Sequence, residues 1–177
     1  MEFLVLTFVG DDRPGFLQEL TEIVTRHQGT WLDSRIINLE GKFAGLVRVG
    51  VDNAHLDALV RALKEDAQGR FNLTIDHPTT PAQSKGTRWQ LDVVGNDRPG
   101  ILNETSRALL EHDLNVIELT SDVRPAAMSG TLLFSCSVTI EVAPSISIST
   151  LEAQLTTIAE DLSLDIRLEP VAKDESS

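Results

Sequence analysis

An eight-residue segment occurs twice and divides the chain into two copies of one unit. Gly-Asp-Asp-Arg-Pro-Gly-Phe-Leu at residues 10–17 returns as Gly-Asn-Asp-Arg-Pro-Gly-Ile-Leu at residues 95–102, with six of eight positions identical. The offset between the copies is 85 residues. The same offset matches Glu19 with Glu104, His27 with His112, and Gly45 with Gly130. A repeat of this kind indicates a tandem architecture and constrains every later step of the interpretation.

The second copy is longer than the first. The apolar positions of a helical pattern in the first copy find their counterparts about ten residues later than the offset of the repeat predicts. These positions are Leu56, Leu59, Val60 and Leu63 in the first copy, and Leu151, Leu155 and Ile158 in the second. We expect the extra residues around positions 141–149.

The length of 177 residues and the repeat together predict two small domains. We expect the first domain at residues 1–77, a linker at 78–87 that is rich in proline and glycine, a second domain at 88–170, and a flexible tail at 171–177. The hydrophobic content of 41% is that of an ordinary globular protein.

The hydrophobic periodicity predicts the order βαββαβ in each copy. In the first copy we expect strands at residues 2–9, 31–39, 42–51 and 71–75, a helix that starts at Pro14 and stops at Gly29, and a helix capped by Asp52 or Asn53. In the second copy we expect strands at 88–94, 115–123, 128–142 and 164–168 and helices at 99–112 and 148–162. The predicted fold class is α+β, with two ferredoxin-like domains in tandem. Each has a four-stranded antiparallel sheet with both helices on one face.

The charge balance argues against a direct nucleic-acid-binding role. The chain has 27 acidic and 15 basic residues, a formal net charge of −12, and no cluster of lysine or arginine. It also lacks an apolar run of membrane-spanning length and has a single cysteine, so we expect a cytoplasmic protein without disulfides and without membrane contact. Any effect on gene expression should pass through a protein or a small molecule.

The sequence has no recognisable catalytic or metal-binding pattern. The four histidines and Cys136 lack metal-ligand spacing, and no nucleophile or phosphate-binding motif occurs. We expect His27 and His112 to meet the last carbonyls of their helices, and Cys136 to be a core thiol. The prediction is a non-enzyme without cofactor or metal.

The repeated loop has the chemistry of an anion site. It joins a strand to a helix N-terminus, where the N–H groups of Gly15, Phe16 and Leu17 should be free and the helix dipole favours a carboxylate. Asp12, or Asp97 in the second copy, offers acceptors for an ammonium group. An equally simple interpretation is a helix start, in which the aspartate caps and the proline presets the backbone. Arg13 and Arg98 could pair with a ligand carboxylate, although we favour solvent-facing or interface positions for them.

The strand, the [DN]-R-P-G-[FIV]-L turn and the following amphipathic helix resemble the ACT domain, a ferredoxin-like regulatory module that typically binds an amino acid. The resemblance covers both halves of the chain. Two such domains and nothing else resemble the glycine cleavage system transcriptional repressor family, whose members are thought to modulate a DNA-binding activator without binding DNA.

The resemblance implies a ligand held between the strand-to-helix loop of one domain and the second strand of the other. The implied ligand-binding residues are Asp11, Asp12, Arg13, Gly15, Phe16, Leu17, Asn96, Asp97, Arg98, Gly100, Ile101, Leu102, Thr30 and Asn115. The chain departs from the family pattern in having aspartate before Arg-Pro-Gly where an amide is common, and in having Thr30 where asparagine is favoured. The bulky Trp31 should oppose a large ligand. We therefore expect two unequal sites.

The implied function is a regulatory protein that senses glycine or a similar small amino acid. It would modulate transcription of glycine-cleavage metabolism by contact with a transcriptional activator or another regulatory protein. The alternative is an interaction module without a ligand, in which the loops only start helices and exposed sheet edges pair with a partner. The same edges allow two chains to pair as a homodimer.

Overall fold

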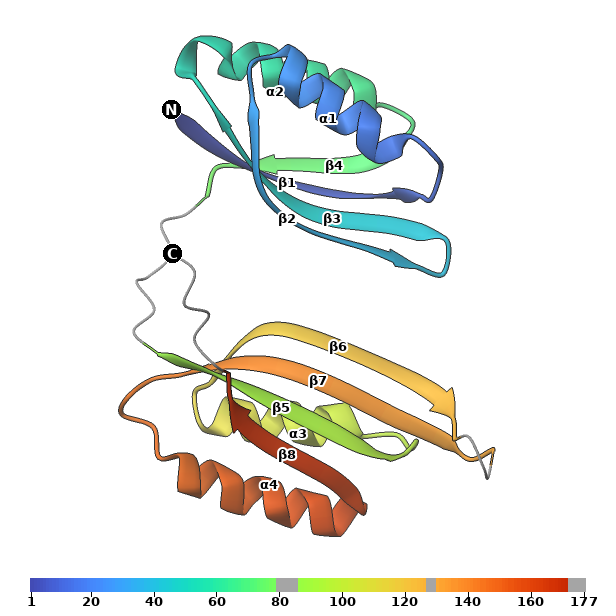
Figure 1. Cartoon of the computed structure of the whole chain (residues 1–177), viewed down its shortest axis with the longest axis vertical. Coiled ribbons are helices and arrows are strands. Elements are labelled where there is room, and N and C mark those ends of the chain that lie inside the picture. The colour runs from blue at the N-terminus through green and yellow to red at the C-terminus, as the bar shows by residue number, and fades with distance from the viewer. Residues whose placement is uncertain (79–85, 127–129, 172–177) are drawn as a thin grey trace. The chain divides into compact units, whose positions relative to one another are not determined.

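The computed structural model describes residues 1–78, 86–126 and 130–171 of the chain. The chain divides into two compact units, Met1–Pro81 and Ala82–Ser177, called domain 1 and domain 2 below. Most of the predicted linker and nearly all of the predicted tail lie outside the described residues. Each domain repeats the same order of elements (Figure 1).

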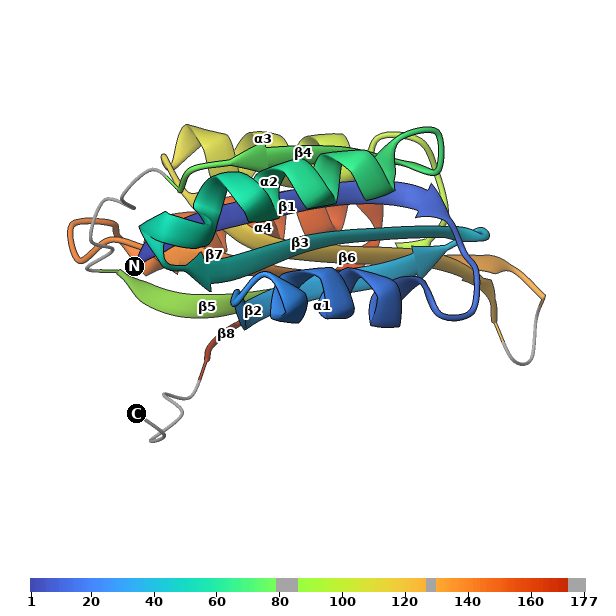
Figure 2. The same cartoon turned by 90° about the horizontal axis from the view of Figure 1, so that it is seen from above.

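Domain 1 is a four-stranded antiparallel sheet with two helices on one face, as Figures 1 and 2 show. Its elements are β1 (Glu2–Asp11), α1 (Phe16–Arg26), β2 (Thr30–Leu39), β3 (Lys42–Val51), α2 (Asn53–Ala67) and β4 (Phe71–Asp76). The strand order is β2-β3-β1-β4, so β1 lies in the middle, and β2 and β4 form the edges. This confirms the predicted ferredoxin-like topology.

Domain 2 repeats this topology with the strand order β6-β7-β5-β8. Its elements are β5 (Thr87–Asn96), α3 (Ile101–Glu111), β6 (Asn115–Pro125), β7 (Leu132–Val142), α4 (Ile148–Leu162) and β8 (Leu164–Pro170). The strand predicted from residue 128 begins at Leu132, and residues 127–129 lie outside the described part of the chain. No helix among the described residues is long and apolar enough to cross a membrane.

Strand alternation builds the core of domain 1. Leu4, Leu6 and Phe8 point to the helices and are at most 1% exposed, because alternate side chains of a strand lie on opposite faces. Four aromatic rings meet where β1 ends, with centroids 4.8 to 5.9 Å apart, and these are Phe8, Phe16, Phe43 and Phe71. Phe8 and Phe16 are buried, and full burial of such a ring stabilises a fold by about 1.5–3 kcal/mol, whereas Phe43 and Phe71 are partly buried.

Domain 2 fills the equivalent space with smaller side chains. Strand pairing and the repeated turn place Val93, Ile101 and Leu164 where domain 1 has Phe8, Phe16 and Phe71. Val93 and Ile101 are buried, and Leu164 is 9% exposed. The duplicated backbone therefore carries two differently packed cores.

Strand pairing corrects one alignment made from the sequence. Gly45 pairs with Phe8, whereas Val93, the counterpart of Phe8, pairs with Cys136. The counterpart of Gly45 is therefore Cys136 and not Gly130. The reason is the longer hairpin between Arg124 and Leu133, the counterparts of Leu39 and Lys42. It has eight residues where domain 1 has two, so it accommodates six of the about ten extra residues. The prediction that placed them at 141–149 is wrong in its main part.

The pairs Phe8–Gly45 and Val93–Cys136 fill similar volumes. Domain 1 combines a large residue with glycine, whereas domain 2 combines two residues of intermediate size. A Cβ atom at Gly45 would lie 2.5 Å from Cζ of Phe8 and 3.0 Å from Cγ1 of Ile36. We predict that Gly45→Cys destabilises domain 1 by about 1–3 kcal/mol through overpacking. Adding Phe8→Val should recover part of that loss, with a coupling energy of about 0.5–3 kcal/mol. Urea unfolding of both single variants and the double variant measures this coupling, and strictly additive effects would contradict the exchange.

Candidate functional site

The repeated loop is a tight turn followed by a helix, and not the first turn of a helix. Gly15 has φ 87° and ψ −10°, and the Phe16 N–H donates to the carbonyl of Arg13 at 3.3 Å. These values describe a type II turn with Pro14 and Gly15 at its centre. The helix α1 begins at Phe16, with Gly15 as its N-cap and no side-chain capping bond. The predicted helix start at Pro14 and the predicted aspartate cap are therefore wrong.

Domain 2 builds the same turn. Gly100 has φ 103° and ψ −15° and is the N-cap of α3, again without a capping side chain. A Cβ atom at either glycine would have no neighbour within 4 Å among the described residues. Glycine is needed here for the left-handed backbone and not to make room for a neighbouring atom.

The free N–H groups differ from those predicted. The N–H of Phe16 is used by the turn, and the first helical bond runs from the Glu19 N–H to the Gly15 carbonyl at 3.0 Å. Within the described chain, no acceptor faces the N–H groups of Gly15 and Leu17. Domain 2 likewise leaves Gly100, Ile101 and Leu102 without a backbone acceptor in the described part. Both turns thus retain donors suited to an anion.

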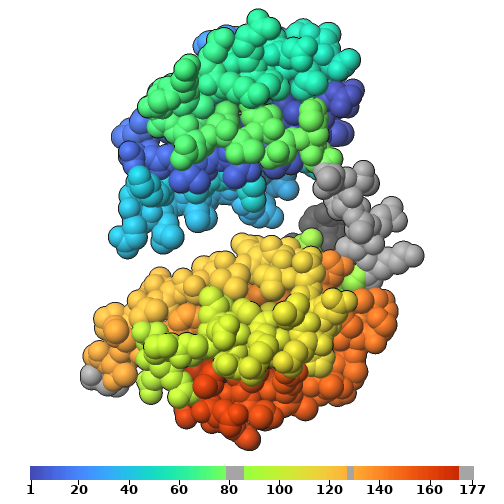
Figure 3. Space-filling model, turned by 180° about the vertical axis from the view of Figure 1, so that it is seen from behind, coloured from blue at the N-terminus to red at the C-terminus, as the bar shows by residue number. Residues whose placement is uncertain are grey.

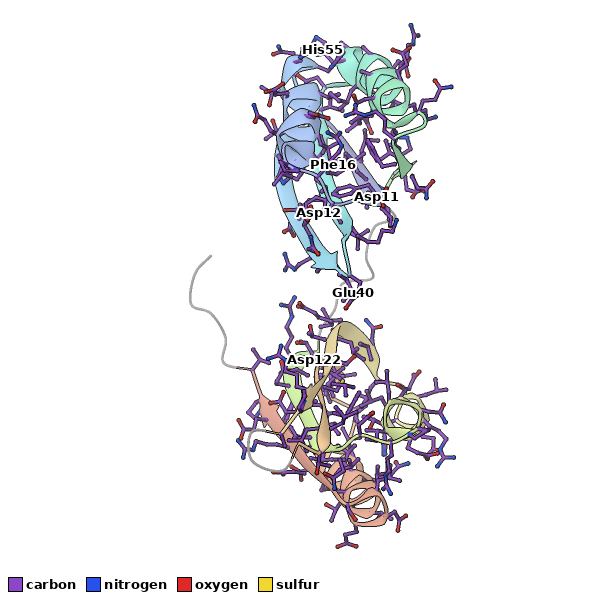
Figure 4. The ribbon with its side chains drawn as sticks, turned by 90° about the vertical axis from the view of Figure 1, so that its right-hand side faces the viewer. Asp11, Asp12, Phe16, Glu40, His55 and Asp122 are labelled. Atoms are coloured by element: carbon purple, nitrogen blue, oxygen red, sulfur yellow. The ribbon has the colours of Figure 1, made fainter. Side chains whose placement is uncertain are left out.

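The two aspartates of the first loop already have partners. Lys42, which lies opposite Asp11 in the β1–β3 pair, forms an ion pair with it and lowers the pKa of that carboxyl, chiefly by hydrogen bonding. Asn38 of β2 donates to the Asp12 carboxylate at 2.6 Å, and the Asp12 N–H donates to the Gly41 carbonyl at 2.9 Å. Figure 4 shows Asp11, Asp12 and Phe16 near one another in domain 1, with His55 apart from them.

Arg13 belongs to a charge network inside domain 1. Its guanidinium donates twice to Glu19, at 2.9 and 2.5 Å, and lies 5.5 Å from the centroid of the Phe16 ring. Arg70, directly before β4, pairs with the same Glu19 carboxylate and with Asp66 of α2. The hydrogen bonds from Arg13, then those from Arg70, lower the pKa of Glu19 to about 2. Arg13 is therefore engaged within its own domain, although its side chain is still 37% exposed. Its predicted pairing across an interface stays a prediction.

The loop of domain 2 has lost most of these partners. Asn96 and Leu133 replace the ion pair of Asp11 and Lys42, and strand pairing places Val123 where Asn38 lies in domain 1. Arg98 donates to the Asp161 carbonyl of α4 at 3.3 Å, and not to Glu104.

The carboxylates of domain 2 are arranged accordingly. Glu104 pairs with Arg107 of its own helix at 2.5 Å. Asp97 keeps its backbone bond to Leu132 at 2.8 Å and has no side-chain partner among the described residues. The carboxylate of Asp97 is therefore freer than that of Asp12.

Thr30 and Asn115 lie far from the loop of their own domain. Thr30 pairs with Gly50, which pairs with Phe3, eight residues along β1 from Asp11. At the rise of a strand this is about 27 Å. Asn115 occupies the equivalent end of domain 2. A small ligand cannot contact both the loop and Thr30 of domain 1, or both the loop and Asn115 of domain 2, so the site implied by the resemblance stays a prediction.

Several other sequence expectations can be compared with the structure. Trp31 is partly buried and packs against the core of domain 1, and its effect on the size of a ligand stays a prediction. His27 donates through Nδ1 to the Ile23 carbonyl at 2.9 Å, as predicted, whereas His112 pairs with the Gln154 side chain at 2.7 Å. Cys136 is buried, and burial raises its pKa. The described residues contain no cluster of three or more His, Cys, Asp or Glu suited to a metal ion.

The sequence interpretation missed Asn38, Asp66 and Arg70. Asn38 and Arg70 contact the loop or α1 from more than 25 residues away, so no local pattern reveals them. The one available signal was the match of Glu19 with Glu104, which marked a repeated carboxylate near each turn.

Glu19 generates a pH prediction. Its pKa in the folded protein lies well below the ordinary value of 4.5, so the ionised form stabilises the fold. This stabilisation is complete above about pH 4.5 and is lost as the pH falls toward 2. We predict that carbon-13 NMR of the Glu19 carboxyl has its midpoint near pH 2 and that Arg70→Gln raises this midpoint. Arg61→Gln, an exposed charge removal on α2, is the matched control. An unshifted midpoint in Arg70→Gln would refute the network.

Comparisons with known proteins agree with this architecture. The ACT domain family matches residues 2–76 and again 88–169. The fold is similar to that of an unknown protein from Galdieria sulphuraria, with 24% identity and a TM-score of 0.85, over 97% of this chain and 99% of that chain.

The fold is also similar to that of a protein described as a "putative glycine cleavage system transcriptional repressor". The identity is 18% and the TM-score 0.70, over 97% of this chain and 98% of that chain. At these identities the likenesses show a shared fold. No curated protein sequence matches the chain. Because the family matches both domains and most of the chain, the protein belongs to the ACT domain family.

Proposed function

We propose that the protein is a non-enzymatic regulator that senses a small amino acid through its ACT domains. The observation that carries this proposal is the turn built twice at a helix start. Each turn leaves N–H groups free beside an aspartate. Free N–H groups at a helix N-terminus suit a carboxylate, and an aspartate carboxylate suits an ammonium group. A free amino acid carries both groups.

The regulatory output is proposed to be protein contact in the cytoplasm, with glycine-cleavage transcription as its target. The fold shared with a protein described as a putative glycine cleavage system transcriptional repressor supports this choice. The net charge of −12 opposes direct DNA binding and favours action through a transcriptional activator or another regulatory protein. Ligand coupling would require that the amino acid bind one conformation of the protein more tightly than another.

The two loops are proposed to be unequal. In domain 1, Asn38 holds Asp12 and Glu19 holds Arg13, so a ligand would have to displace internal bonds. In domain 2, Asp97 has no such side-chain partner, and the N–H groups of Gly100, Ile101 and Leu102 have no backbone acceptor, among the residues that the structure describes. We therefore propose domain 2 as the source of the main ligand loop, formed by Asn96, Asp97, Arg98, Gly100, Ile101 and Leu102.

The internal hydrogen bonds of the domain 1 loop favour a second candidate function, an interaction module without a ligand. If these bonds persist, Asp11–Leu17 is only a structural turn and the protein acts as an interaction module without a ligand. The two hypotheses differ in whether an amino acid changes stability, since a ligand that binds only the folded state at one hundred times its Kd adds about 2.7 kcal/mol.

We predict that glycine or another small amino acid binds and raises the melting temperature. Isothermal titration calorimetry and thermal unfolding of the full chain with each proteinogenic amino acid measure both effects. Asp97→Ala should weaken binding more than the equivalent Asp12→Ala, because the Asp97 carboxylate is free to accept an ammonium group. Asp165→Ala, an exposed charge removal on β8, is the matched control. If no amino acid binds at millimolar concentration and none raises the melting temperature, the interaction module is the correct function.

A further inference from the structure

Domain 2 has an open groove between its two helices. Its volume is about 380 Å³, and its lining includes Glu104 and Arg107 of α3 and Ile158, Asp161 and Leu162 of α4. Ile158 and Leu162 are partly buried and pack on the core, so they form an apolar floor. Figure 3 shows α3, in yellow-green, and α4, in orange-red, beside each other on the surface of domain 2. The groove thus combines an apolar floor with a carboxylate at its rim.

Domain 1 shows what occupies the corresponding place there. Glu19, the repeat counterpart of Glu104, holds two guanidinium groups, from Arg13 and from Arg70. Arg70 comes from the connection between α2 and β4 and is anchored a second time on Asp66. The glutamate of the first copy therefore serves as a receptor for an arginine of its own chain.

Domain 2 retains the glutamate and lacks the arginine. The residue directly before β4 is Arg70, whereas the residue directly before β8 is Ser163, and the helix before it ends at Leu162. Neither replacement carries a charge. Arg98, the counterpart of Arg13, has turned to the Asp161 carbonyl, so Glu104 receives a guanidinium only from Arg107.

Domain 2 also has a larger surplus of acidic side chains than domain 1. Residues 86–171 carry thirteen acidic and five basic side chains, whereas residues 1–78 carry twelve and eight. A surplus of this size attracts a basic partner and speeds its encounter with the domain.

We propose that the groove between α3 and α4 of domain 2 binds an arginine side chain of a partner protein, in the position that Arg70 fills in domain 1. The aliphatic stem of that arginine would lie on Ile158 and Leu162, and its guanidinium would reach the Glu104 carboxylate. Arg107 does not block this contact, because its side chain is 62% exposed and because Glu19 shows that one carboxylate can hold two guanidinium groups. Asp161 adds a second acidic group at the rim, as Asp66 does for Arg70.

This inference adds to the proposed function the chemistry by which the partner protein is recognised. It rests on the proposed function only in that a partner protein exists. The probe is the capped tripeptide acetyl-Gly-Arg-Gly-amide, titrated into the full chain without any amino-acid effector. Its neutral control is the same peptide with citrulline in place of arginine. Methyl NMR of Ile158 and Leu162 reports occupancy of the groove.

We predict that the arginine peptide shifts the methyl signals of Ile158 and Leu162 and that the citrulline peptide binds about tenfold more weakly, because the charge-assisted bonds are lost. Glu104→Gln should weaken the arginine peptide to a similar extent, whereas Glu118→Gln on β6, with the same change of charge, should not. Unshifted groove methyls, equal binding of both peptides, or equal effects of the two variants would each overturn the proposal. Failure here leaves amino-acid binding intact, and failure of calorimetry with amino acids leaves this titration unaffected, so the two outcomes are distinguishable.

Discussion

The left-handed glycine between the first strand and first helix of each domain is the constraint on which both domains depend. A type II turn closed by Gly15 reverses the chain directly after β1 and sets the position at which α1 starts. That start places Phe16 against Phe8 in the core. It also brings Glu19 within reach of Arg13 on the outside. A side chain with a Cβ atom would find open space at Gly15 and would still be disfavoured, because the backbone angle and not the volume selects glycine.

The backbone of this turn has been kept in both copies while its side-chain partners have diverged. In domain 1, Asn38, Lys42, Glu19 and Arg70 bind the loop or the charged residues beside it. In domain 2, Val123 replaces Asn38, Leu133 replaces Lys42, and Ser163 lies where Arg70 lies in domain 1. The glutamate is retained as Glu104. The cores diverged in parallel, from four packed phenylalanine rings to smaller aliphatic side chains around Phe134. The identical residues of the repeated octapeptide are therefore explained by the backbone conformation of the turn. They do not show that the two loops bind a ligand equally.

Sequence patterns predicted the fold well because local chemistry determines it. Strand alternation placed Leu4, Leu6 and Phe8, helical spacing placed Leu20 and Val24, and the repeat fixed the topology of the second domain. The errors arose where a residue type fits two backbone states. Pro14 suits both the first turn of a helix and the centre of a type II turn, and the structure selects the second.

The candidate site was less predictable because its contacts are distant in sequence. Asn38 reaches Asp12 across 26 residues and Arg70 reaches Glu19 across 51, so neither leaves a periodic signal.

These contacts also make the two loops differ in their ability to bind a ligand carboxylate. An acidic residue beside a helix N-terminus repels a ligand carboxylate unless its charge is directed to another cation or to the ligand's own ammonium group. Lys42 and Asn38 contact the aspartates of domain 1, whereas Asp97 has no side-chain partner in the described chain and its carboxylate is exposed, so it can accept an ammonium group. Glu104 pairs with Arg107 but lacks a second guanidinium group of the kind that Arg70 gives to Glu19. Both carboxylates lie within residues 86–171, which carry thirteen acidic and five basic side chains, so this part of the chain is better suited to a cationic partner than residues 1–78.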